Sequence, residues 1–114
     1  MTTTPFTTTG QLAATAGALQ TNPAATTTQI KSVFVHNTNT TAETVQIYLV
    51  PNASGALGTA ALTNRLVYFP LAANETVEVT QTFPWTLANT NDALFAVTTT
   101  AAKVTYTVSG VKTS

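Results

Sequence analysis

The chain contains no cysteine and a single histidine, His36, among its 114 residues. Without cysteine it cannot form disulfide bonds or thiolate-ligated zinc and iron–sulfur sites. With one histidine, a single chain cannot assemble the paired imidazole ligands that many metal sites use. The sequence therefore predicts no metal centre and no cofactor.

Charged residues are also scarce, at 7% of the chain against about 25% in an average protein. Four basic residues balance four acidic ones, so the net charge is zero. Four dispersed bases cannot form the basic stripe that a nucleic-acid surface requires, and no nucleic-acid partner is expected. Few charges also give little protection against self-association, which favours a protein whose surface is covered in a larger assembly. The alternative is a monomer kept soluble by its Thr and Asn side chains.

Long apolar runs are missing as well. No stretch approaches the roughly 18 consecutive apolar residues of a membrane-spanning helix, so no membrane partner is expected. The first residues, MTTTPF, have no basic region and no long apolar stretch after them, so no secretory signal is expected.

The residues for catalysis do not form a recognisable constellation. A Ser–His–acid triad would need His36, and no Gly-x-Ser-x-Gly sequence marks a nucleophile. Glu75 and Glu78 are three residues apart on a predicted strand, so their side chains point to opposite faces. No phosphate-binding loop follows Gly55 or Gly58. We therefore expect no enzyme activity, no catalytic residues and no small-molecule substrate, and we interpret His36 as a hydrogen-bonding residue at a strand end.

Threonine is the commonest residue, and it dominates the first part of the chain. Residues 1–28 carry runs of Thr, no charge, and few large apolar side chains, among them Phe6 and Leu12. Such a segment cannot by itself bury enough apolar surface to offset its ordering entropy. It is predicted to be an extended N-terminal arm, mobile in the free protein, with Phe6 and Leu12 as its contacts to a partner. The domain at 29–114 is expected to fold without it.

From residue 29 the pattern changes to a period of two, typical of β-strands. Short apolar runs at 30–35, 43–50, 62–69, 76–81, 94–99 and 103–111 are separated by turn residues. No long helical pattern intervenes. This spacing predicts an all-β domain, either an antiparallel β-sandwich or a jelly-roll-like barrel. Phe83 and Trp85 flank Pro84 outside these runs, and two interpretations stay open for them: a plug at the end of the sandwich, or a subunit contact.

Two strand segments carry a resemblance to a known group. Residues 30–38 (IKSVFVHNT) and 45–51 (VQIYLVP) resemble strands of small virion proteins of tailed bacteriophages. Residues 71–76 (LAANET) are similar to an "LAAGET" turn of that group, and the end at 104–111 (VTYTVSGV) is similar to its last strand. Asn74 and Asn91 stand where the group has glycine, and Asn tolerates the left-handed backbone region.

The resemblance implies a structural component of a phage particle. Proteins of this kind include capsid decoration, or cement, proteins that bind the major capsid protein on the outer surface of the virion, often as homotrimers. A second function stays open, a receptor- or glycan-binding module of the tail or neck. Its sugar site would combine Trp85 with the polar residues Asn89, Asn91 and Asp92.

The strand at 43–50 gives a direct test of the predicted register. Val45, Ile47 and Leu49 should face the core, so Ile47→Asp buries an unpaired carboxylate and should lower the free energy of unfolding by several kcal/mol. Thr44→Asp and Gln46→Asp, on the other face, should have small effects in the same urea denaturation. Equal losses in all three variants would mean that the register is shifted by one residue.

Overall fold

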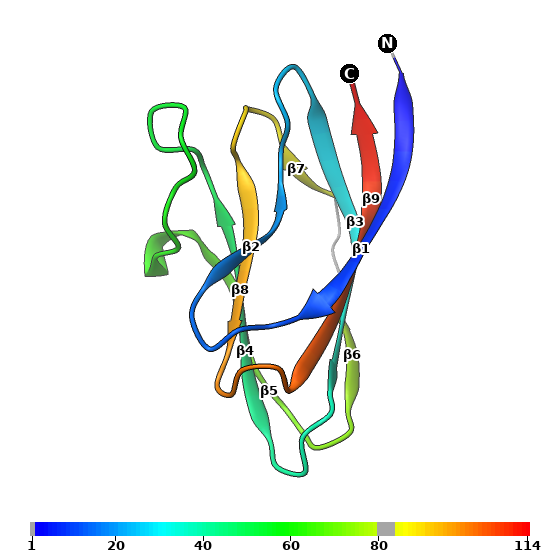
Figure 1. Ribbon diagram of the computed structural model, residues 1–114, viewed down its shortest axis with the longest axis vertical. Helices are drawn as coiled ribbons and strands as arrows, with labels where there is room; N and C mark the ends of the chain where they lie inside the picture. Colours follow the sequence, from blue (N-terminus) through cyan, green and yellow to red (C-terminus); the bar gives the residue numbers. More distant parts are fainter. Residues whose placement is uncertain (1, 80–83) are drawn as a thin grey trace.

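The computed structural model describes residues 2–79 and 84–114, which form two antiparallel β-sheets packed face to face (Figure 1). One sheet, here called sheet A, has the order β1-β9-β3-β6, and β7 also pairs with β3. The other, sheet B, has the order β2-β8-β4-β5. Sheet A contains β1 (Thr3–Gln11), β9 (Val104–Thr113), β3 (Thr27–Asn37), β6 (Thr76–Val79) and β7 (Trp85–Leu87). Sheet B contains β2 (Gly17–Thr21), β8 (Ala93–Thr98), β4 (Glu43–Val50) and β5 (Arg65–Leu71), which the short 3-10 helix η1 (Leu62–Asn64) precedes.

The strand pairing is that of a jelly roll. β1 pairs with β9, β2 with β8, β3 with β6 and β7, and β4 with β5, all antiparallel. The β3–β9 and β4–β8 ladders then join these pairs into the two sheets. Eight strand positions in this order, the sixth shared by β6 and β7, are the jelly-roll arrangement. The predicted all-β sandwich is confirmed. No helix in the described residues is long and apolar enough to cross a membrane.

The main core lies between the sheets. Val45 and Ile47 of β4 are fully buried there, and Leu49 packs against the same cluster, as the period of two predicts. The other fully buried large side chains are Leu12, Ile30, Val33, Val35, Leu71, Leu87, Leu94, Val104 and Val108, with Val50 on the far side of sheet B.

A second, smaller apolar cluster covers part of the outer face of sheet B. Tyr48, Val50, Ala93 and Phe95 form it, and Ala16, Ala60 and Val97 pack against it. Tyr48 is only 8% exposed although its neighbours Ile47 and Leu49 point to the opposite face. The strand is therefore covered on both faces over its second half, because the loop at 51–61 folds back over it.

The N-terminal segment differs from the predicted arm. β1 pairs with β9 along its whole length and β2 pairs with β8, so residues 3–21 belong to both sheets. The extended conformation was predicted correctly, but the separation into an arm at 1–28 and a domain at 29–114 was not. The physical reason is that the segment is stabilised by backbone ladders to residues about 70 to 110 positions away, which its own composition does not reveal. Without it, β8 and β9 would each lose a partner and Leu12 would leave the core.

Two turns confirm the role expected of asparagine. Asn74, in the β5–β6 turn, has a φ of 61°, and Asn91, before β8, has a φ of 67°. Both lie in the left-handed region, where asparagine is tolerated better than most residues. A short strand was missed, however: Trp85 lies in β7 opposite Ile30 of β3, rather than in a break between strands.

A buried carboxylate joins two loops at one end of the sandwich. Glu43 is 3% exposed, and its Oε1 accepts hydrogen bonds from the Thr100 backbone N–H at 2.8 Å and the Thr98 hydroxyl at 3.2 Å. Its Oε2 accepts one from Asn39 Nδ2 at 3.1 Å. Burial raises the pKa of Glu43, but the hydrogen bonds from Thr100, Asn39 and Thr98 outweigh it and hold the pKa below its ordinary value.

Replacement of this carboxylate should change the acid stability of the fold. A depressed pKa contributes stability above the unfolded value of about 4.3, and that contribution is lost as the pH falls through the lower folded value. Glu43→Gln should lower the free energy of unfolding at pH 7 by about 1–3 kcal/mol, since it loses charge-assisted hydrogen bonds. The difference from the wild type should shrink as urea denaturation is repeated toward pH 3. Glu78→Gln, on an exposed side chain, is the control and should leave the curve unchanged; a constant difference at all pH values would contradict the assignment.

Candidate interaction surfaces

The titratable residues do not gather into a chemical site. Within residues 2–79 and 84–114, no group of three or more His, Asp or Glu side chains is placed to hold a metal ion. His36 lies on the outer face of sheet A, where its Nδ1 is 2.7 Å from the Thr76 hydroxyl of the neighbouring strand. Glu75 caps its own turn by accepting the Ala72 N–H at 2.8 Å, while Glu78 is exposed on β6. Each of these residues has a local structural role or faces solvent.

The polar residues considered for a sugar site are used to hold loops together. Asp92 accepts the backbone N–H of Asn52 through Oδ1 and that of Asn89 through Oδ2, both at 2.9 Å. Asn91 donates its amide to the Gly55 carbonyl at 2.8 Å. These bonds tie the loop after β4 to the turn before β8, so the Asp92 carboxylate is already occupied by protein donors.

The aromatic residue considered for that sugar site is Trp85. Trp85 is half-buried and packs against the main core, which agrees with the plug interpretation. An open cavity of about 170 Å³ lies nearby, lined by Leu49, Val50, Pro51, Thr86 and Asp92, without Trp85. Its lining is largely apolar, and it presents no aromatic platform for a sugar ring. Phe83, named with Trp85 as a possible contact, lies outside the described residues.

The two residues predicted to anchor an arm to a partner contact their own domain instead. Leu12 is 1% exposed and belongs to the main core. Phe6 packs at the margin of that core, with Lys112 Nζ 5.2 Å from the centre of its ring. Leu12 is therefore inaccessible to a partner in this fold.

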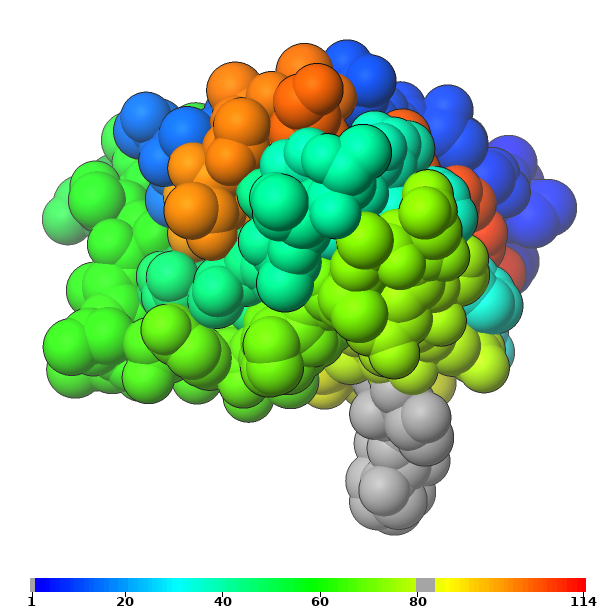
Figure 2. Space-filling view, turned by 90° about the horizontal axis from the view of Figure 1, so that it is seen from below, coloured from blue at the N-terminus to red at the C-terminus, as the bar shows by residue number. Residues whose placement is uncertain are grey.

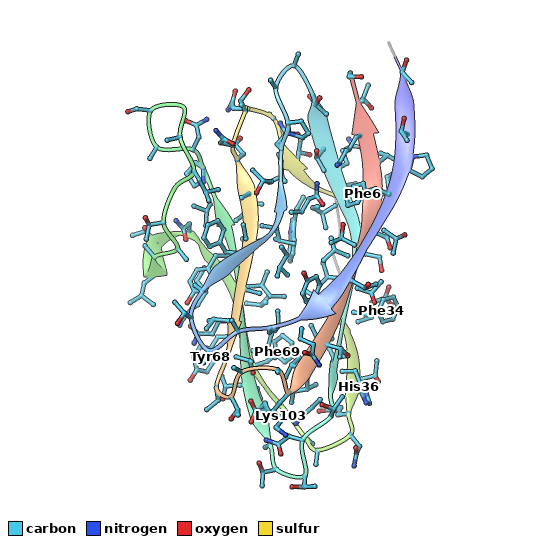
Figure 3. The ribbon with its side chains drawn as sticks, in the orientation of Figure 1. Phe6, Phe34, His36, Tyr68, Phe69 and Lys103 are labelled. Carbon is cyan, nitrogen blue, oxygen red and sulfur yellow. The ribbon has the colours of Figure 1, made fainter. Side chains whose placement is uncertain are left out.

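Strand β5 and the loop before it carry most of the exposed large apolar side chains, a surface that the sequence pattern did not predict. Five large apolar residues are exposed in the described part of the chain, and four of them lie on β5 or in the loop that leads into it. We call these four the β5 patch: Leu57 (48% exposed), Leu62 (75%), Leu66 (41%) and Tyr68 (59%). Figure 3 shows Tyr68 pointing away from the sandwich while the next residue, Phe69, points into it.

The β5 patch is held by contacts with the neighbouring strand. The Arg65 guanidinium stacks 4.8 Å from the centre of the Tyr68 ring, and Arg65 Nη1 donates to Gln46 Oε1 at 3.3 Å. The same Gln46 oxygen accepts the Tyr48 hydroxyl at 2.8 Å. An arginine and a tyrosine fixed in this way beside exposed leucines have the composition of protein–protein hot spots. The one signal in the sequence was that residues 66–71 (LVYFPL) are apolar on both faces of the strand, although an edge strand with one face in solvent needs apolar residues on one face only.

The outer face of sheet A is different in character. The alternation of β1 and β9 places Thr7, Thr9, Thr105, Thr107 and Ser109 on this face, away from the core. The Thr7 and Ser109 hydroxyls lie 3.3 Å apart, as do those of Thr3 and Thr113. Phe34, 41% exposed, is the remaining exposed large apolar residue in the described chain and lies on this face. The face is therefore mainly a hydroxyl surface, and the concentrated apolar surface lies across the molecule on β5.

Comparisons with known proteins give a fold but no family. No protein-family model matches the chain, and no curated protein matches it either. Among solved structures, it is similar to a chain from the work "Bacillus endospore appendages form a novel family of disulfide-linked pili", with 12% identity and a TM-score of 0.53 over 97% of this chain and 85% of that one. A second match, to the VP2 subviral particle of infectious bursal disease virus, has 13% identity and a TM-score of 0.30, and it covers 96% of this chain and 32% of that one. The first of these similarities shows a shared overall fold across nearly the whole chain.

Proposed function

We propose that this chain is a structural subunit of a virion, and specifically a decoration protein on the outer surface of a mature phage capsid. The observation that carries the proposal is the β5 patch, four exposed large apolar side chains on the edge strand β5 and in the loop that leads into it, in a charge-poor sandwich. Exposed apolar surface of this kind marks protein–protein contact sites. The proposed partners are the major capsid protein and, once bound to the shell, further copies of this chain in a homotrimer. No catalytic role is assigned.

The contact differs from the one predicted from the sequence, in which an N-terminal arm would reach a partner through Phe6 and Leu12. β1 and β2 are part of the sheets, so they are not free to reach across to a shell subunit. The β5 patch takes over that role without any rearrangement. Full burial of a leucine or tyrosine side chain contributes about 1.5–3 kcal/mol, so a few such residues support a specific contact when they lie on rigid structure.

Stabilisation of a shell requires only binding. A ligand that binds the mature shell and not its disassembled subunits adds RT ln(1 + [L]/Kd) for each site. Summed over the many equivalent positions of a capsid lattice, this contribution resists internal pressure without any chemical step.

The similarity to an appendage subunit is compatible with this proposal and sets one limit. That work describes disulfide-linked pili, and this chain has no cysteine with which to form such links. A jelly roll without cysteine must assemble through non-covalent contacts. Self-assembly into a filament is therefore an outcome that the experiment below also detects.

The tail or neck function remains the second candidate, motivated by the group of Trp85, Asn89, Asn91 and Asp92. The structure offers it less support, since Trp85 packs on the core and the Asp92 oxygens already accept protein hydrogen bonds. Binding to host cells or to glycans would favour it.

The test is binding to bare, expanded phage shells, followed by co-sedimentation and by the rate of heat- or chelator-induced DNA release. The wild type should co-sediment and delay release. The double variant Leu66→Ser, Tyr68→Ser should bind at least ~30-fold more weakly, because hot-spot side chains each contribute about 1 kcal/mol or more. Phe34→Ser is the matched control, since Phe34 has the same exposed fraction as Leu66, 41%, on the opposite sheet. It should bind like the wild type.

Folding of each variant is checked by circular dichroism and urea denaturation. A wild-type protein that neither co-sediments nor delays release, and instead binds host cells or glycans, would transfer the function to the tail. A wild-type protein that forms filaments alone would support an appendage subunit.

A further inference from the structure

The outer edge of β1 is the feature from which a further contact follows. β1 ends sheet A, with β9 as its only partner in the described residues. At one end of this ladder, Thr2 and Ser114 exchange both backbone hydrogen bonds, at 2.8 and 2.9 Å; at the other, Leu12 N–H donates to the Val104 carbonyl at 2.8 Å. In an antiparallel ladder such hydrogen-bonded positions alternate with positions whose backbone groups point away. The even-numbered residues of β1 therefore face β9, and the odd-numbered residues face outward.

Pro5 agrees with this alternation. Proline has no N–H and is tolerated in a sheet where that group would face away from the ladder. Pro5 lies opposite Val111 at one of the outward positions, so no bond to β9 is lost. The unpaired N–H and C=O groups of the edge then belong to Thr3, Thr7, Thr9 and Gln11, while Pro5 offers only its carbonyl. We call these groups the free edge of β1.

The free edge of β1 has little protection against pairing. Natural edge strands are usually guarded by charged residues, bulges, prolines or short length. β1 has nine residues, no charged side chain and no register shift against β9, and Pro5 guards only its first part. From Thr7 to Gln11 every outward position can both donate and accept.

The other edges of the described sheets are guarded. β2 has five residues and a register shift against β8. β5 carries Arg65 and Pro70 and has a register shift against β4. The described part of β6 has four residues, one of them Glu78, and β7 has three. An edge strand pairs best with a long, regular and uncharged strand, and within this protein that strand is β1 itself.

We propose that β1 is a self-association site at which the β1 strands of two copies pair antiparallel across a two-fold axis. The contact is isologous, the commonest arrangement of soluble homo-oligomers, and the absence of charge on β1 removes any repulsion between the copies. It extends sheet A of one copy into sheet A of the next through backbone hydrogen bonds. The outward Thr side chains of the two strands then form one continuous hydroxyl surface.

This site is distinct from the β5 patch. The Thr8 hydroxyl of β1 donates to Gln20 Oε1 of β2 at 3.2 Å, so the free edges of β1 and β2 share one side of the sandwich. β5 ends sheet B on the other side. Seen from below in Figure 2, the chain start and the loop before β5 lie at opposite ends of the molecule. The two-fold contact therefore leaves the β5 patch accessible, and it does not depend on the proposed binding to a shell.

The experiment measures self-association of the purified chain in solution, without shells, by analytical ultracentrifugation and residue-resolved amide hydrogen exchange. Between about 10 µM and 1 mM the wild type should pass from monomer to dimer, the range expected for a contact made mainly of backbone hydrogen bonds. The amides of Thr7, Thr9 and Gln11 should become protected as the concentration rises. Those of Thr8 and Gly10, which bond to β9, should be protected at every concentration.

The deciding variant is Thr7→Pro. It removes an outward N–H, as Pro5 already does, and should leave the β1–β9 ladder and the melting temperature nearly unchanged while weakening dimerisation at least ~10-fold. Thr7→Ala, which keeps the N–H, should dimerise like the wild type. Thr8→Pro removes a bond to β9 and should lower the melting temperature, which checks the alternation itself.

A wild type that stays monomeric at about 1 mM, or a folded Thr7→Pro variant that dimerises like the wild type, would overturn the inference. Either result leaves shell binding through the β5 patch untouched, because Thr7→Pro alters only the β1 side of the molecule. Loss of shell binding by the Leu66→Ser, Tyr68→Ser variant is likewise independent of dimerisation.

Discussion

The pairing of β9 on both of its edges is the interaction on which the rest of the structure depends. β9 holds β1 on one side and β3 on the other, and through them the N-terminal segment and the centre of sheet A. The ladder to β3 contains a bulge between Ile30 and Ser32, and Gly110 lies opposite it. A Cβ atom on Gly110 would lie 1.9 Å from the Gln29 carbonyl oxygen, so the two backbones approach too closely for any side chain there.

The same ladder makes the fold strongly non-local. β1 and β9 lie at opposite ends of the sequence, and Thr2 pairs with Ser114. Each such contact must close a long loop of chain before it stabilises the fold. The entropic cost of loop closure therefore precedes the stabilisation from the hydrogen bonds of the ladder. A Thr-rich strand with one aromatic residue is stable in this position because its backbone hydrogen bonds are made with a strand that the core already holds.

The chain has eight charged residues, so buried polar side chains hold its loops in place through hydrogen bonds, a role that ion pairs often have in other proteins. Asn22 is 1% exposed; its amide donates to the Thr26 and Asn89 carbonyls and its oxygen accepts the Thr28 hydroxyl. Asn37, at the other end of the sandwich, donates to the Thr41 and Leu71 carbonyls. Together with Glu43, these side chains hold the loops, which leaves the outer surfaces free for contacts. The apolar β5 patch and the free edge of β1 then lie on opposite sides, an arrangement suited to a subunit with more than one neighbour.

The sequence by itself determined the class of the fold and much of its local detail. The period of two located β4 to the residue and oriented Val45 and Ile47, and the resemblance placed Asn74 and Asn91 at turn positions where that group has glycine. These features depend on neighbours within a few positions, so the local pattern contains them. Only the tertiary structure decided that residues 3–21 pair into both sheets and that a loop covers Tyr48. It also decided that the Asp92 carboxylate accepts hydrogen bonds from Asn52 and Asn89, and that Leu66 and Tyr68 are exposed. Those outcomes depend on which strands become edges and which segments pair across the whole chain, and no local alternation of apolar and polar residues records that choice.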